Sequence, residues 1–115
     1  MKFANAPALV LLLISGVAGA ADFAYIPNFD DGDVDVFDIS TQSVVDSIVV
    51  GDSPWGIAVN ESGTEAYVTN SNAGTVSVID LSTNTVLATI GVGNGPVGIA
   101  VTPDGSRVYS VNRDD

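Results

Sequence analysis

From residue 22 onwards, short stretches in which apolar and polar residues alternate are separated by residues that favour turns. In residues 75–80, Val76 and Val78 alternate with Thr75 and Ser77. In a strand, the two valines would lie on one face and the two polar residues on the other. Between such stretches, clusters of Gly, Pro, Asp and Asn predict tight turns. Strands are predicted at 65–70, 75–80, 85–90, 97–102 and 107–112. The pattern therefore predicts an all-β fold beyond the N-terminal segment.

The chain repeats itself with a period of 42 residues, marked by Tyr25, Tyr67 and Tyr109. Residues 25–66 laid over 67–108 without a gap share 18 identical positions out of 42, which chance would not produce. A period of about 40–45 residues with only strand-like stretches is typical of four-stranded β-propeller blades. The sequence therefore predicts β-propeller repeats, about two and a quarter four-stranded antiparallel blades, which is an incomplete propeller.

Small and apolar residues mark one strand of each repeat, at 55–59 and 97–101. A strand that is apolar on both faces is typical of one covered on both sides. The glycine and alanine in these strands suit the place where successive sheets converge on a central axis. Gly32 and Gly74 are expected to take a positive φ in hairpins, and Asp38 and Asp80 to cap their turns.

Residues 1–20 have the organisation of a cleaved signal peptide, expected to be helical. Lys2 precedes an apolar run over residues 8–17, and Ala18-Gly19-Ala20 forms the small-residue cleavage pattern. Cleavage one residue later is an alternative, and so is a retained anchor, although the run is shorter than the roughly 20 residues of a spanning helix. We expect an exported mature chain, 21–115, located in the periplasm, outside the cell or on its surface, with no membrane association after cleavage.

Two long stretches identify a family resemblance. YVTNSNAGTVSVIDLSTNTVLATI at 67–90 and GNGPVGIAVTPDGSRVYSVN at 93–112 resemble the YVTN β-propeller repeat. The resemblance covers about 25–112, with repeat units at about 25–66 and 67–108 and a third beginning at 109. It implies four-stranded blades in extracytoplasmic propellers of bacteria and archaea, among them surface-layer proteins and the propeller parts of periplasmic oxidoreductases. Pro27 departs from the pattern and predicts an edge or a bulge.

The number of blades leaves three hypotheses for the whole protein. Closed propellers typically have 4–8 blades, more than this chain provides. The expected explanation is that the sequence is the N-terminal fragment of a longer protein, whose remainder completes the propeller. The alternatives are a ring formed by further copies of the chain, and a stand-alone pair of stacked sheets with open edges.

Composition excludes several kinds of chemistry. The chain has 14 Asp and Glu against 3 Lys and Arg, a net charge of −11, and no His or Cys. It therefore has no disulfide, no thiolate or imidazole metal ligand and no Ser-His-Asp triad. The acidic balance also argues against nucleic acid as a partner, because phosphate binding needs Lys and Arg.

Two features are candidate sites. Asp30, Asp31, Asp33 and Asp35 form an acidic stretch that could suit a hard cation such as calcium, although the spacing is not that of an EF-hand loop. We favour a solvated hairpin turn there and predict no metal site. Trp55 could stack on a sugar ring or a partner, although filling of the core is the commoner role. No catalytic or cofactor-binding residue is identified, and no cofactor is expected.

The expected function is a non-catalytic exported module for binding or scaffolding at the cell envelope. Its partners would be the rest of a longer propeller or further copies of itself, together with envelope proteins or polysaccharide. The alternative is the propeller portion of a periplasmic oxidoreductase whose cofactor ligands lie outside this chain.

Overall fold

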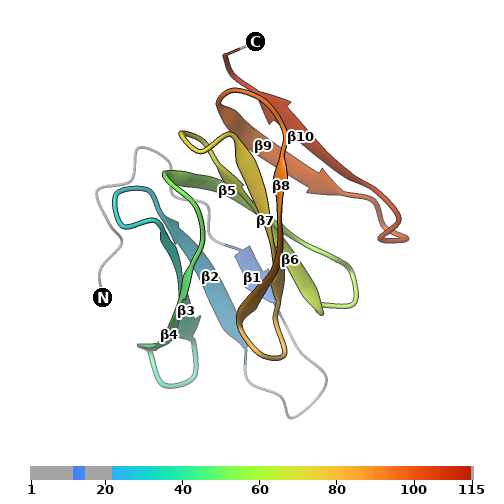
Figure 1. Cartoon of the computed structure of the whole chain (residues 1–115). Helices are drawn as coiled ribbons and strands as arrows, with labels where there is room; N and C mark the ends of the chain where they lie inside the picture. The colour runs from blue at the N-terminus through green and yellow to red at the C-terminus, as the bar shows by residue number, and fades with distance from the viewer. Residues whose placement is uncertain (1–11, 15–21, 115) are drawn as a thin grey trace.

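A computed structural model describes residues 12–14 and 22–114, and every regular element among them is a β-strand. The strands form three antiparallel sheets, with the orders β1-β2-β3-β4, β5-β6-β7-β8 and β10-β9 (Figure 1). We call them the first, second and third sheets. Their strands are β1 Leu12–Ile14, β2 Phe23–Asn28, β3 Asp33–Asp38, β4 Ser43–Val49, β5 Pro54–Val59, β6 Glu65–Asn70, β7 Thr75–Asp80, β8 Thr85–Gly91, β9 Pro96–Val101 and β10 Val108–Asn112.

The predicted strands are confirmed, with ends that differ by at most one residue. The tyrosines that mark the 42-residue period occupy equivalent places in β2, β6 and β10. Tyr25 lies opposite Val36 in the first sheet, and Tyr67 lies opposite Val78 in the second. Equivalent strands of the two copies therefore pair in the same register, and the last strand of each copy, β5 or β9, belongs to the next sheet.

The helical signal peptide is corrected at the three residues of that segment that the structure describes. Leu12–Ile14 form β1, which pairs antiparallel with β2 so that Leu12 lies opposite Tyr25. In the second sheet, Ala58 of β5 lies opposite the equivalent Tyr67. In the first sheet, β1 therefore occupies the place that β5 occupies in the second. An extended apolar segment fits there because the edge of β2 carries backbone groups that need partners. The rest of the predicted segment 1–20 lies outside the described residues.

Turn chemistry in the two repeats follows the sequence closely. Gly32 and Gly74 have φ values of +72° and +69°, and the backbone N–H of each donates to the carbonyl of Asn28 or Asn70. Asp38 accepts hydrogen bonds from the backbone N–H and the hydroxyl of Ser40, and Asp80 accepts the same pair from Ser82. Both sets of predictions are confirmed.

The main hydrophobic core lies between the first and second sheets. One sheet contributes Tyr25, Val34, Val36 and Ile48, and the other contributes Ile57, Ala66, Val68 and Ile79. These residues alternate along their strands with side chains on the opposite face, so each strand directs one set into the interface. Burial of this apolar area, at roughly 25 cal/mol per Å², is the main favourable term that holds the two sheets together.

A close backbone contact joins the second and third sheets. β9 packs against β5 and β6, and the Cβ of any larger residue at Gly56 would collide with the Val97 carbonyl oxygen. The Gly56 N–H donates to Thr69 Oγ1 over 2.9 Å, and that hydroxyl donates to the Val97 carbonyl over 3.1 Å. Glycine is therefore required at position 56, because only a residue without a side chain allows β5 and β9 to approach so closely.

Replacement of Ile79 by Ala is expected to destabilise the protein by about 2–4 kcal/mol, because Ile79 is fully buried in the core and the truncation leaves a cavity. Ile90→Ala is the matched control. Ile90 is half exposed on the same sheet, and its truncation should cost less than about 1 kcal/mol. Urea unfolding followed by circular dichroism measures both changes, and equal losses would contradict the proposed position of the core.

Candidate functional site

Strands β5 and β9, which are the first strands of the second and third sheets, form a hollow of about 400 Å³. It is lined by Trp55, Gly56, Ile57, Val97, Gly98 and Ile99. Two of the six positions are glycines, so part of the wall is bare backbone, and no titratable side chain lines it. The hollow can therefore accept an apolar or flat group, and it holds no side chain that could act as an acid or a base.

Trp55 has a defined place at this hollow. It is partly buried, and its ring meets the Phe29 ring edge-on, with centroids 5.6 Å apart and an interplanar angle of 79°. Phe29 comes from the turn after β2, so a contact between two sheets holds the indole in position. Trp55 thus packs against a neighbour while it lines an open surface, and both uses considered from the sequence remain compatible with its position.

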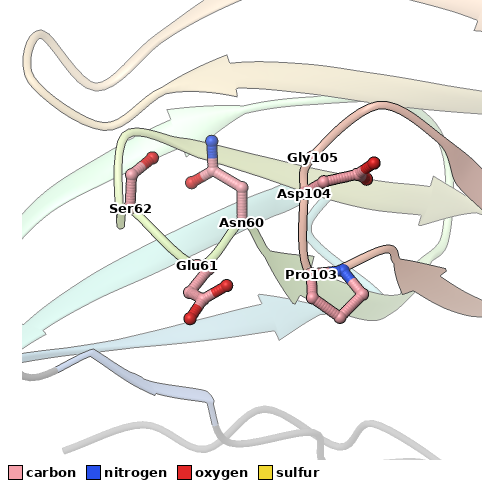
Figure 2. Close-up of a pocket in the computed structure, with 6 residues that line it drawn as sticks. All are labelled: Asn60, Glu61, Ser62, Pro103, Asp104 and Gly105. Atoms are coloured by element: carbon pink, nitrogen blue, oxygen red, sulfur yellow. The ribbon is translucent and has the colours of Figure 1, made fainter.

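A second, polar pocket lies between the turns that follow β5 and β9 (Figure 2). It encloses about 440 Å³ and is lined by Asn60, Glu61, Ser62, Pro103, Asp104 and Gly105. The sequence predicts only tight turns at these positions. The 42-residue spacing of the two turns could have indicated the pocket, because equivalent turns of successive repeats lie at the same end of adjacent sheets.

The polar side chains of this pocket mainly support their own turns. Asn60 Oδ1 accepts the Thr64 and Glu65 N–H groups. Asp104 accepts hydrogen bonds from the Thr102 hydroxyl at 2.6 Å and from the N–H and hydroxyl of Ser106. The hydrogen bond from Thr102, followed by those from Ser106, lowers the pKa of Asp104 from 3.8 to about 2.

The acidic stretch is divided between a turn and a strand. Asp30 and Asp31 are exposed in the turn after β2, whereas Asp33 and Asp35 lie on β3. Asp33 accepts hydrogen bonds from Asn28 Nδ2 at 2.8 Å and from the Ser47 hydroxyl at 3.0 Å. Within residues 12–14 and 22–114, no group of three or more Asp, Glu, His or Cys side chains is arranged to hold a metal ion.

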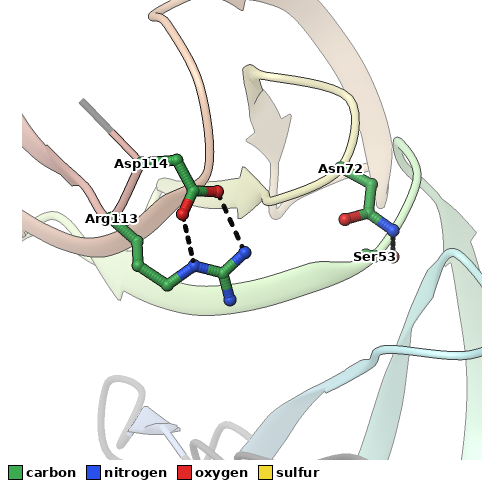
Figure 3. A network of polar contacts seen from close by, with 4 residues as sticks. All are labelled: Ser53, Asn72, Arg113 and Asp114. Atoms are coloured by element: carbon green, nitrogen blue, oxygen red, sulfur yellow. Dashed lines mark hydrogen bonds and ion pairs between the residues drawn. The ribbon is translucent and has the colours of Figure 1, made fainter.

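Polar contacts form in the linker before β5 and in the segment after β10 (Figure 3). Asn72 Nδ2 donates to the Ser53 hydroxyl over 2.8 Å, which ties the linker before β5 to the turn after β6. Arg113 forms two hydrogen bonds of 3.0 Å to Asp114, through Nε and Nη2, and lowers the pKa of that carboxyl. The Arg113–Asp114 pair is about half exposed, so it contributes little to stability.

The part of the chain that the structure describes contains no helix long and apolar enough to cross a membrane.

Comparison with known proteins supports the fold. No protein-family model matches the chain, and no curated protein matches it. Among solved structures, hydrazine synthase from Kuenenia stuttgartiensis is similar over 87% of this chain, with 31% identity and a TM-score of 0.76. A functionally unknown protein from Desulfotomaculum acetoxidans DSM 771 is similar over 78%, with 26% identity and a TM-score of 0.70.

A third structure, the dihydro-heme d1 dehydrogenase NirN in complex with DHE, has a TM-score of 0.74 over 87% of this chain. Its 15% identity shows a likeness of fold alone. This chain spans 28%, 31% and 22% of the lengths of the three proteins, in the order given. Since the neighbours are of propeller type, the antiparallel sheets of this chain have a propeller-like fold.

The Asp104 carboxyl is expected to titrate with a pKa of about 2 in the folded chain. Because this value lies below the ordinary 3.8, the group contributes stability above pH 3.8 that is lost as the pH falls towards 2. Thr102→Ala removes the largest cause and should raise the pKa towards 3.8. Carboxyl chemical shifts measured by NMR test this prediction, and an unchanged pKa in Thr102→Ala would contradict the assigned cause.

Proposed function

We propose that this chain is part of an exported β-propeller that binds or scaffolds other molecules at the cell envelope, without catalysis by its own side chains. The observation that carries the proposal is the hollow between β5 and β9, where Trp55 lies beside bare glycine backbone. A preformed apolar surface with one aromatic side chain is suited to recognition. The lining offers no nucleophile or proton-transfer group, so binding is the chemistry that it supports best.

The rigid frame around the hollow favours the same proposal. Trp55 is braced by Phe29, and Gly56 is held by the Thr69 hydroxyl and by its close contact with Val97. Such a surface loses little conformational freedom when a ligand binds. We propose a sugar ring of an envelope polysaccharide, or an apolar segment of an envelope protein, as the group that lies against Trp55.

A second candidate function is the propeller portion of a periplasmic oxidoreductase, with cofactor ligands outside this chain. It is favoured by the likeness to the enzyme hydrazine synthase, at 31% identity over 87% of this chain. In that case the hollow would form part of the wall beside a cofactor. Residues of another polypeptide segment would hold the cofactor itself, because this chain has no His or Cys.

Calorimetric titration of the full chain with two probes tests and separates the two functions. A muropeptide from bacterial cell wall represents the sugar ligand, and iron protoporphyrin represents a flat cofactor. For the binding module we expect the muropeptide to bind and Trp55→Ala to weaken it at least about tenfold, since stacking on the indole is lost. Binding of the porphyrin alone would favour the oxidoreductase.

Leu87→Ala is the control for this titration, because Leu87 is exposed on β8 and does not line the hollow. Its affinity for either probe should be unchanged. If neither probe binds, or if Trp55→Ala binds as tightly as the unsubstituted chain, the proposed surface is wrong.

A further inference from the structure

The linker between the second and third sheets contains an Asn-Gly pair, Asn94-Gly95, directly before β9. Asn94 is the only asparagine of the sequence that is followed by a glycine. Its side chain is exposed, and within residues 12–14 and 22–114 neither the Asn94 carboxamide nor the Gly95 N–H forms a hydrogen bond. The side-chain amide and the backbone nitrogen that follows it are therefore both available for reaction.

The backbone on both sides of Asn94 is that of glycine. Gly93 and Gly95 have φ values of +111° and +64°. Glycine takes such values without steric cost, and it has no Cβ that could shield its own backbone nitrogen. The Asn94 side chain can therefore turn towards the Gly95 nitrogen without displacing a neighbouring side chain.

The equivalent linker before β5 has different chemistry on a similar backbone. Asp52 and Ser53 occupy the places of Asn94 and Gly95 in the repeat. Ser53 also has a positive φ, +58°, and its hydroxyl donates to Asp52 Oδ1 over 3.3 Å and accepts Asn72 Nδ2 over 2.8 Å. A side chain therefore shields the nitrogen of residue 53, and a carboxyl group takes the place of the amide. Only the linker before β9 combines a free amide with a bare nitrogen.

We propose that Asn94 is a site of spontaneous deamidation and isomerisation, in which the Gly95 backbone nitrogen is the nucleophile. Asparagine is among the residues that are chemically labile in proteins. The Gly95 nitrogen attacks Asn94 Cγ, so that a new C–N bond forms and the bond from Cγ to Nδ2 breaks. The proton of the Gly95 N–H leaves with the side-chain nitrogen as ammonia, and a cyclic succinimide remains. Water then opens the ring at either carbonyl to give aspartate or isoaspartate, and no oxidation or reduction takes place.

The two products have different consequences for the linker. Aspartate is the residue that the first linker has at this place, Asp52, so the added charge alone is compatible with the backbone. Isoaspartate inserts a methylene group into the main chain directly before Gly95, whose carbonyl accepts the Arg113 N–H over 2.7 Å. The longer main chain displaces that carbonyl and weakens the contact between the linker and the end of β10. The proposal concerns covalent chemistry of the linker, so it does not depend on which ligand binds at Trp55.

Incubation of the full chain at mildly alkaline pH, followed by peptide mapping with electron-transfer mass spectrometry, tests the proposal. We expect aspartate and isoaspartate to accumulate at residue 94, and to do so faster as the pH rises, because attack requires loss of the Gly95 N–H proton. Asn72 is the internal control, since it is also exposed but is followed by Ala73 and donates to Ser53. Asn72 should react at least about tenfold more slowly than Asn94.

Gly95→Ser should slow the reaction at residue 94 at least about tenfold, because a side chain then shields the attacking nitrogen. The equivalent residue is serine at a φ of +58°, so the backbone accepts the change once the exposed Asp114 side chain moves aside. Asn94→Gln is a second variant, which keeps the glycine and moves the amide carbon one methylene further from the nitrogen. It should also stay unmodified, and circular dichroism checks that both variants are folded.

Amide hydrogen exchange measures the consequence for the linker. In the isoaspartate form, the Arg113 N–H is expected to exchange at least about tenfold faster than in the unmodified chain, because its hydrogen bond to Gly95 is weakened. Freshly prepared Asn94→Asp is the matched control, since it carries the new charge on a main chain of ordinary length. Its Arg113 N–H should exchange at the unmodified rate.

Several outcomes would overturn the proposal. Equal rates at Asn94 and Asn72 would show that the linker has no special reactivity. Aspartate without isoaspartate would indicate direct hydrolysis of the amide by water, and an unchanged rate in Gly95→Ser would exclude control by the bare nitrogen. Unchanged exchange of the Arg113 N–H in the isoaspartate form would refute the predicted effect on the linker.

Discussion

Face-to-face packing of twisted antiparallel sheets is the interaction on which the rest of this structure depends. Each sheet has apolar residues that only a neighbouring sheet can cover. The first and second sheets cover each other's apolar faces, with Tyr25 and Val36 on one side and Val68 and Ile79 on the other. Four strands give each layer enough width to bury the outer residue Ile48 as well as the inner ones. The fold is therefore cooperative between neighbours, and a single repeat could not hide its own apolar surface.

Much of the fold could be predicted from the sequence, because strands and turns depend on local patterns. The alternation of Val76 and Val78 with polar residues located β7, and Gly32 and Gly74 located hairpins that need a positive φ. The 42-residue period then allowed a strand or turn predicted in one repeat to be placed at the equivalent residues of the next. The same local reasoning was wrong for Leu12–Ile14, since pairing with the distant strand β2 decides their conformation.

The candidate site was less predictable, because it depends on contacts between sheets. Trp55 could be singled out as an unusual residue at a repeat position, but its edge-on contact with Phe29 requires the relative placement of two sheets. The polar pocket forms only because the turns at Asn60 and Asp104 belong to adjacent sheets. In contrast, the acidic run looked conspicuous in the sequence, and the structure divides it between a turn and a strand that uses Asp33 for local hydrogen bonds.

The Thr69 hydroxyl links the second sheet to the third through Gly56 and Val97, and Pro27 occupies the equivalent place in the first sheet. Proline has no hydroxyl and no N–H, so its side chain cannot form such a bridge at the junction between the first and second sheets. That junction is held instead by the apolar core and, at the outer strands, by a hydrogen bond of 3.1 Å from Asn84 Nδ2 to Asp46. The two junctions of the molecule are therefore held by different kinds of interaction, a directional hydrogen-bonded bridge at Gly56 and a broad apolar core between the first and second sheets.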